Sequence, residues 1–275
     1  MNPVLGRRPE GRARSRLAAA ARYPARVSDF PTASTTEDFR RNLTLVEQRI
    51  AAACARAGRE RSQVRLLPVS KTVDEPRMRA AIAAGMRSFG ENKVQEAKAK
   101  AAALADLPDL SWSVIGHLQT NKAKDVVAFA HEFQALDSLR LAEALDRRLQ
   151  AAGRGLDVFV QVNTSAEESK YGLPAEEVAG VLAALPQFAS LRVRGLMTLA
   201  VFSPDAEAVR ACFVRLRDLR DRLRERFEGL DELSMGMSGD YPLAIEEGAT
   251  VVRVGQAVFG RRATPDALYW PADGV

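Results

Sequence analysis

The chemistry that this sequence could support centres on one lysine, Lys71. It directly follows residues 64–70, an apolar run with the pattern of a buried strand. A side chain at the carboxyl end of a buried barrel strand reaches the barrel mouth, where burial disfavours the charged form of an amine. A neutral amine attacks carbonyl groups, so the sequence predicts Schiff-base chemistry at Lys71. An isolated lysine would more often extend into solvent, so the prediction depends on the residues around it.

Two loops of small residues predict a phosphate site. They read MGMSGD (235–240) and RVGQ (253–256), and they belong to the ends of the last two predicted strands. Glycine lets backbone N–H groups approach an anion, the Ser238 hydroxyl adds a donor, and a helix after Gly255 would point its positive end at the same place. Barrels commonly bind phosphate after their seventh and eighth strands. Either loop alone fits an ordinary turn, whereas both together favour a phosphate site.

Further side chains lie at other strand ends. Arg253 belongs to the strand that would neighbour the Lys71 strand in a closed barrel, so its charge would depress the pKa of the Lys71 amine. Asn92 could hydrogen-bond a bound ring or cap the next helix. A structural and a catalytic role both stay open for His117. Three methionines are expected to pack in the core, against a flat ring if one is bound: Met197, Met235 and Met237.

The elements that must position these residues alternate strictly between strand and helix patterns. Eight such units predict parallel pairing and a closed (β/α)8 TIM-type barrel. An open doubly wound sheet is the competing fold, but it usually has a glycine-rich turn after its first strand, and Ser70-Lys71-Thr72 has no glycine. The predicted strands span residues 64–70, 87–90, 111–116, 132–136, 157–163, 191–198, 232–235 and 250–254. The predicted helices span residues 75–84, 93–104, 121–129, 139–151, 175–185, 205–227, 241–247 and 257–261.

The barrel is predicted to be a single domain, residues 36–275, that opens with an additional helix. That helix begins near Thr36, where hydroxyl and acidic residues form a typical helix N-terminus, and should end near Gly58. Residues 1–35 read as a disordered Arg-rich extension, with seven arginines and two acids before residue 31. A transit peptide is the alternative interpretation of that segment.

Composition excludes several classes of protein. The chain has 275 residues, an ordinary length for a barrel, and its net charge of +5 lies mostly in the extension, so nucleic acid is not an expected partner. Cys54 and Cys212 have no neighbouring metal-ligand pattern, which argues against a metal site or a disulfide framework and favours the cytoplasm. No apolar run approaches the roughly 20 residues that cross a membrane.

Seven stretches, in order along the chain, resemble the family of pyridoxal phosphate homeostasis proteins. Taken together they cover nearly all of the chain after the extension, and as a set they are highly specific. The stretches are LLPVSKT (66–72), FGENKVQEAKAK (89–100), WSVIGHLQTNKAK (112–124), QVNTSAEESKYG (161–172), RGLMTLA (194–200), LSMGMSGDYPLAIEEGAT (233–250) and VVRVGQAVFGRR (251–262).

The resemblance implies the barrel of the alanine racemase N-terminal domain, with pyridoxal 5'-phosphate (PLP) as cofactor, bound as a Schiff base on Lys71. It places Arg253 at the pyridine nitrogen. Gln256 departs from the small hydroxyl residue common in the family, so its backbone N–H is the expected contact there. The phosphate would be held by Ser238, Gly239, Gly255 and Gln256, and the expected cofactor-binding set is completed by Asn92 and Met235.

A cofactor carrier is expected rather than an enzyme, with no catalytic residue. Related alanine racemases take a second base from a C-terminal β-domain, and only about twenty residues follow Arg253 here. An arginine at the ring nitrogen also leaves the ring a poor electron sink. The expected role is non-enzymatic PLP (vitamin B6) homeostasis in a monomer or weak dimer, with PLP-dependent apoenzymes as partners. The alternatives are an amino-acid racemase, with Tyr171, Tyr241 or His117 as second base, and a Schiff-base aldolase of a sugar phosphate.

Overall fold

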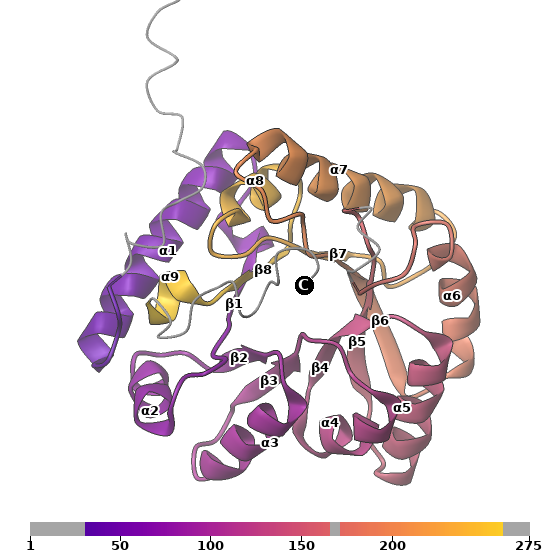
Figure 1. Ribbon diagram of the computed structural model, residues 1–275, viewed down its shortest axis with the longest axis horizontal. Coiled ribbons are helices and arrows are strands. Elements are labelled where there is room, and N and C mark those ends of the chain that lie inside the picture. Colours follow the sequence, from indigo (N-terminus) through magenta and orange to yellow (C-terminus); the bar gives the residue numbers. More distant parts are fainter. Residues whose placement is uncertain (1–30, 166–170, 261–275) are drawn as a thin grey trace, which may run out of the picture.

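The computed structural model describes residues 31–165 and 171–260, and within them eight parallel strands form a nearly closed barrel (Figure 1). The strand order is β1-β8-β7-β6-β5-β4-β3-β2, and a parallel bridge between Val69 and Gly90 joins the two ends. The predicted barrel is therefore confirmed. The strands are β1 (Arg65–Pro68), β2 (Ser88–Glu91), β3 (Ser111–Val114), β4 (Glu132–Leu136), β5 (Leu156–Gln161), β6 (Leu191–Met197), β7 (Glu232–Ser234) and β8 (Val251–Val254).

Helices between the strands form the outer ring of the barrel, as Figure 1 shows. Residues 120–122 form a 3₁₀ turn, so the helix predicted over 121–129 begins as an α-helix only at Ala123. None of the helices in the described ranges has the length and apolarity needed to cross a lipid bilayer. The helices are α1 (Thr36–Arg56), α2 (Glu75–Ala83), α3 (Val94–Ala103), α4 (Ala123–Phe129), α5 (Leu139–Ala151), α6 (Val178–Ala184), α7 (Ala206–Leu223), α8 (Tyr241–Glu246) and α9 (Gln256–Phe259).

Helix α1 begins where the sequence predicted. Thr35 and Asp38 form a capping box, in which each side chain accepts a hydrogen bond from the other residue's backbone N–H. The ring of Phe39 packs edge-on against Phe259, with centroids 5.5 Å apart. Ala33, placed by the sequence in the extension, is buried and donates its N–H to the Phe259 carbonyl at 3.3 Å. Residues 1–30 lie outside the described ranges, so the domain boundary stays a prediction.

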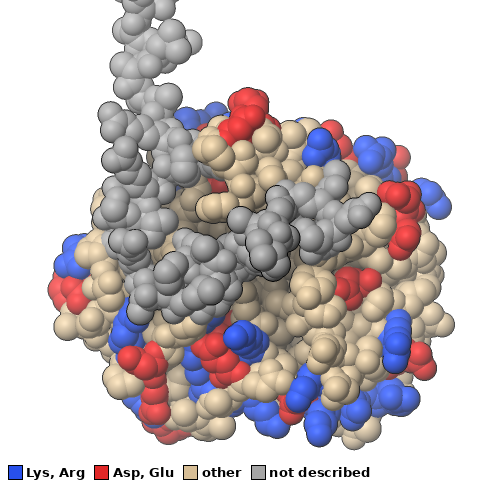
Figure 2. All heavy atoms as spheres, in the orientation of Figure 1, with Lys and Arg blue, Asp and Glu red and all other residues tan. Residues whose placement is uncertain are grey.

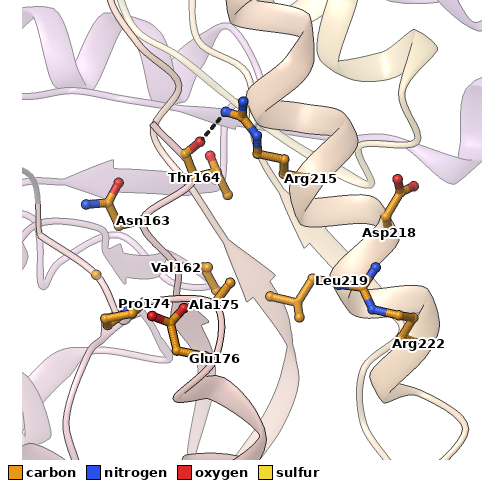
Figure 3. Close-up of a pocket in the computed structure, with 11 residues that line it drawn as sticks. Val162, Asn163, Thr164, Pro174, Ala175, Glu176, Arg215, Asp218, Leu219 and Arg222 are labelled. Carbon is orange, nitrogen blue, oxygen red and sulfur yellow. Dashed lines mark hydrogen bonds between the residues drawn. The ribbon is translucent and has the colours of Figure 1, made fainter. Parts of the chain in front are cut away.

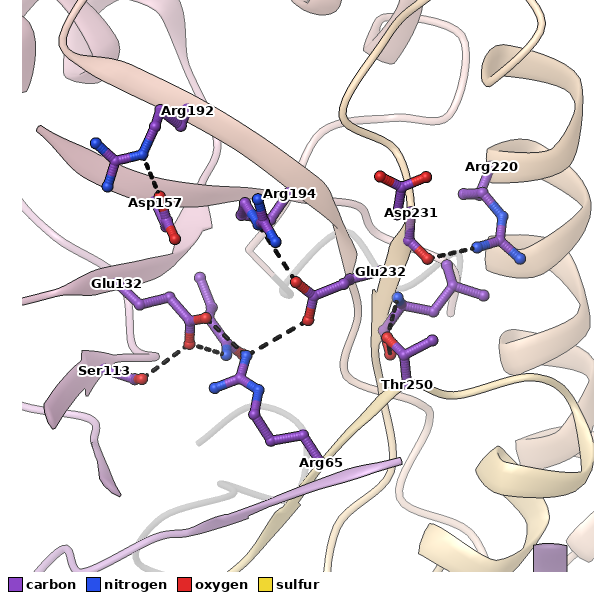
Figure 4. Close-up of polar contacts among 12 residues, drawn as sticks. Arg65, Ser113, Glu132, Asp157, Arg192, Arg194, Arg220, Asp231, Glu232 and Thr250 are labelled. Atoms are coloured by element: carbon purple, nitrogen blue, oxygen red, sulfur yellow. Dashed lines mark hydrogen bonds and ion pairs between the residues drawn. The ribbon is translucent and has the colours of Figure 1, made fainter. Parts of the chain in front are cut away.

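A layer of charged side chains lies at the amino ends of the strands (Figure 4). Arg65, the first residue of β1, pairs with Glu132 of β4 at 2.7 Å and with Glu232 of β7 at 3.6 Å. Glu232 also pairs with Arg194 of β6, and Glu132 accepts a hydrogen bond from Ser113. These contacts pair the charged groups named here with one another, and barrel sites usually lie at the opposite end, where the strands finish.

Candidate functional site

Lys71 lies in a tightly held turn at the end of β1. Ser70 is buried and donates its backbone N–H to the Gly90 carbonyl, while Val69 donates to Val254, both at 3.0 Å. The chain before Lys71 is therefore tied to the strands on both sides. After it, Thr72 has φ 65°, a left-handed conformation that costs a β-branched residue about 1–3 kcal/mol. Lys71 itself is half-buried.

Arg253 is fixed inside the barrel on β8, the neighbour of β1. Its side chain is buried and donates to the Ser234 hydroxyl at 2.6 Å and to the Thr198 carbonyl at 2.7 Å. The register pairs Arg253 with Leu67, four residues before Lys71. Burial lowers the pKa of the guanidinium to about 10, so Arg253 remains a cation at neutral pH.

A chain of side-chain hydrogen bonds continues from Arg253 across the barrel. The Ser234 hydroxyl donates to Oε1 of Gln134 at 2.6 Å, and Nε2 of Gln134 donates to Oε1 of Glu132 at 2.5 Å. Ser234, Gln134 and Glu132 are all buried. Because each member has a partner, the guanidinium is held in one orientation. Its charge is opposed first by Asp240 and then by Glu132.

The loops after β7 and β8 are joined by one hydroxyl group. Oγ of Ser238 accepts the N–H groups of Gly255 at 3.2 Å and Ala257 at 3.3 Å. Since both acceptor positions are occupied, the hydroxyl hydrogen is left to donate to another group. The two predicted phosphate loops thus meet, as a shared anion site requires.

The two glycines of the loop after β7 differ in their surroundings. Gly236 has φ 92°, and a Cβ there would lie 2.6 Å from the Cβ of Ala244, so the tight turn requires glycine. By contrast, a Cβ on Gly239 would meet nothing within 4 Å. The backbone N–H groups of Ser238 and Gly239 donate to no described residue. Helix α9 has only four residues, so individual N–H groups, rather than a long helix, would attract the anion.

Asp240 closes this loop with a buried carboxyl group, which accepts the N–H of Met237. Burial raises the pKa of Asp240 to about 6, against an ordinary value of 3.8. The folded protein therefore binds more protons than the unfolded chain between these values, and stability falls as the pH rises through them. At pH 7.5 the ionised group costs on the order of 2–3 kcal/mol.

We expect Asp240→Asn to remove this cost, because an amide oxygen still accepts the Met237 N–H. In urea denaturation at pH 7.5, the variant should be more stable than wild type by on the order of 2–3 kcal/mol, and this difference should shrink toward pH 4. Equal pH dependence of the two proteins would contradict the raised pKa.

The remaining predicted cofactor residues lie at the same end of the barrel. Met235 is fully buried just after β7, which confirms its core packing. Asn92 is half-buried after β2, and its side chain has no hydrogen-bond partner among the described residues. It does not cap α3, whose N-cap is Lys93, so the capping alternative is wrong. Gln256 is half-buried and begins α9.

The three candidate second bases differ in access. Tyr241 is fully buried, and burial raises the pKa of its hydroxyl to about 12. The His117 ring stacks on Tyr171 with centroids 4.1 Å apart, and its Nδ1 lies 3.1 Å from a carboxylate oxygen of Asp137. Tyr171 is 59% exposed. His117 and Tyr171 could therefore meet a ligand, whereas Tyr241 is enclosed in the core.

Several charged residues beside Lys71 were not among the predicted site residues. Glu91, Glu96 and Lys100 form a cluster against the Ser70–Thr72 turn. All three lie in the stretch FGENKVQEAKAK (89–100), but the one pattern that singles any of them out is the four-residue spacing of Glu96 and Lys100, which is also that of an ordinary surface pair.

A hollow of about 800 Å³ lies outside the barrel, between the segment after β5 and helix α7 (Figure 3). Arg215 of α7 lines it and donates to the Thr164 carbonyl at 2.8 Å. Neither Lys71 nor Ser238 lines it, and it is lined by both acidic and basic side chains.

Basic and acidic side chains of the described residues also alternate around the face seen in Figure 2. Within the described ranges, no three His, Cys, Asp or Glu residues gather as metal ligands.

Comparison with known proteins agrees with this fold. Residues 42–263 match the family model described as "Alanine racemase, N-terminal domain". The pyridoxal phosphate homeostasis protein of Pseudomonas aeruginosa is 44% identical over 221 residues, which are 80% of this chain and 94% of the relative. That of Escherichia coli K12 is 39% identical over 229 residues, which are 82% and 97% of the two chains.

Solved structures give the same result. PipY of Synechococcus elongatus, solved with PLP bound, is 40% identical to this chain, with a TM-score of 0.69. The match covers 78% of this chain and the whole of the PipY chain. Alanine racemase from Streptomyces coelicolor is 22% identical with a TM-score of 0.62; it covers 82% of this chain and 60% of its own, and shares the fold alone. The barrel is thus of the alanine racemase N-terminal type. Within that class, the chain belongs to the family of pyridoxal phosphate homeostasis proteins.

Proposed function

We propose that this protein binds PLP covalently through Lys71 and serves PLP homeostasis without catalysing a reaction of its own. The observation that carries the proposal is the convergence of three features on adjoining strand ends. These are the turn that holds Lys71 after β1, the buried Arg253 on β8, and the loops joined by Ser238. A relative that was solved with PLP bound supports the choice of ligand.

The residues at the barrel mouth fit the parts of PLP. Ser238 and Gly239 offer a hydroxyl and backbone N–H groups beside open space, which suits the phosphate. Arg253 would meet the ring nitrogen, and Met235 and Asn92 would lie against the ring. PLP supplies an aldehyde: the Lys71 amine would add to its carbon, a C=N bond would form and one water molecule would leave. Hydrolysis reverses the step and releases the cofactor intact, as a carrier requires.

Arg253 also favours a carrier over a catalyst. Its buried guanidinium is fixed by Ser234 and Thr198. A guanidinium donates hydrogen bonds and accepts none, so at the ring nitrogen it would favour the unprotonated form, which can accept from it. A ring that stays unprotonated stabilises carbanions poorly. The residues therefore favour binding at the aldehyde over proton transfer at an amino acid.

One observation favours racemase activity as a second candidate. Asp137 holds His117, and an oriented imidazole at a barrel mouth is suited to general-base chemistry. We expect no such activity: PLP-loaded protein incubated with L-alanine in D2O should leave the α-hydrogen in place, as proton NMR would show. Deuterium incorporation that is lost in His117→Ala would instead establish an enzyme.

Titration of the purified protein with PLP tests the binding proposal directly. A visible absorbance band that saturates at one cofactor per chain is expected. A protein that leaves the spectrum of free PLP unchanged would contradict the proposal.

A further inference from the structure

The backbone on the far side of Lys71 is held by a side chain from helix α3. Thr72 has φ 65°, which a β-branched residue adopts only when its surroundings hold it there. The Thr72 N–H donates to Oε1 of Glu96 at 2.6 Å. The strained residue next to Lys71 is therefore stabilised by one carboxylate.

The backbone on the near side is held by the same cluster. Nζ of Lys100 donates to the Ser70 carbonyl at 2.6 Å, to Oε1 of Glu91 at 2.7 Å and to Oε1 of Glu96 at 2.7 Å. The Ser70 hydroxyl also donates to Oε1 of Glu91, at 2.6 Å. The Lys100 ammonium therefore holds the backbone on both sides of Lys71: directly at the Ser70 carbonyl, and through Glu96 at the Thr72 N–H.

Lys100 is the cation that balances two acidic side chains in a largely buried cluster. Its side chain is 11% exposed, and Glu91 is fully buried, with no hydrogen-bond partner for its Oε2 among residues 31–165 and 171–260. Burial raises the pKa of Glu91, and the charge of Lys100 opposes that rise. Without the ammonium, Glu91 and Glu96 would be two neighbouring carboxyl groups with no cation between them.

We propose that Lys100 is a positioning residue for Lys71. Its ammonium, together with Glu96, fixes the Ser70–Thr72 backbone so that the Lys71 amine is presented to an aldehyde. All three N–H donors of Lys100 are used, so it is held as a structural cation and does not compete for the aldehyde. The inference rests on the proposed function at Lys71.

The test is Lys100→Met, compared with Lys98→Met on the same helix. Lys98 is 54% exposed and pairs with Asp125, away from the turn. Stopped-flow absorbance should show that the PLP band of Lys100→Met forms more slowly by about tenfold to a hundredfold, while Lys98→Met matches wild type. Borohydride reduction should still label Lys71 in both variants. A Lys100→Met protein with the wild-type rate would overturn the inference.

A second change separates positioning from general stability. Adding Thr72→Gly to Lys100→Met should restore part of the lost rate, because glycine adopts the left-handed conformation without the steric penalty. No recovery would count against the backbone role.

If Lys100→Met does not fold, Glu96→Ala removes only the Thr72 contact and the ion pair, and it should slow the band several-fold; an unchanged rate would overturn the inference. In contrast, a band that survives in Lys71→Ala would refute the proposed function itself.

Discussion

Replacing Lys71 by alanine is expected to abolish the visible band that forms when the protein is titrated with PLP. The band requires a C=N bond, and alanine has no amine with which to form it. Ser70 keeps its hydrogen bond to Gly90 in the variant, so the barrel should stay folded. PLP should still bind without a covalent bond, because the loops joined by Ser238 are unchanged. Absorbance and equilibrium dialysis would measure these two effects separately.

Lys93→Ala is the matched control for this prediction. Lys93 follows β2, the other neighbour of β1, and its side chain is exposed. Its removal should leave the band and the affinity unchanged. A band of wild-type intensity in Lys71→Ala would show that another amine binds the aldehyde.

Ser238→Asp is expected to weaken PLP binding by about two to three orders of magnitude. A carboxylate can still accept the N–H groups of Gly255 and Ala257, so the loops should stay joined. It would, however, place a negative charge against the phosphate. Two unit charges 4 Å apart repel by about 4 kcal/mol in surroundings of intermediate polarity, which corresponds to a factor of roughly a thousand.

Ser238→Asn is the isosteric control, and pyridoxal is the control ligand. Asparagine keeps the acceptor without the charge, so its effect on PLP affinity should be small beside that of aspartate. Pyridoxal has no phosphate, so Ser238→Asp and Ser238→Asn should bind it alike. If both variants bound PLP equally well, the phosphate would have to lie elsewhere.

The barrel could be predicted from the sequence because strand and helix patterns depend on local burial. Residues 132–136 and 139–151 were predicted to the residue. The first strand was predicted over 64–70 but pairs regularly only over Arg65–Pro68. Beyond Pro68, a single bridge at Val69 and the turn through Thr72 replace regular strand pairing. A run of apolar residues in the sequence does not show where pairing stops.

The position of the site was predictable for a related reason. In a parallel barrel all strands finish at one end, so Lys71 and the loop containing Ser238 had to lie at the same face. The supports of Arg253 were not predictable, because its hydrogen-bond chain runs through Gln134, more than a hundred residues away. Two polar residues at alternate positions of β4, Glu132 and Gln134, were the available signal for a polar chain inside the barrel.

Borohydride reduction of the PLP-loaded protein, followed by peptide mapping, tests the central claim most directly. Reduction makes the bond between cofactor and lysine permanent, so the labelled residue can be identified by mass spectrometry. A single modified site at Lys71, with one cofactor per chain, is the predicted result. A label on another lysine, or none at all after the band has formed, would contradict the account.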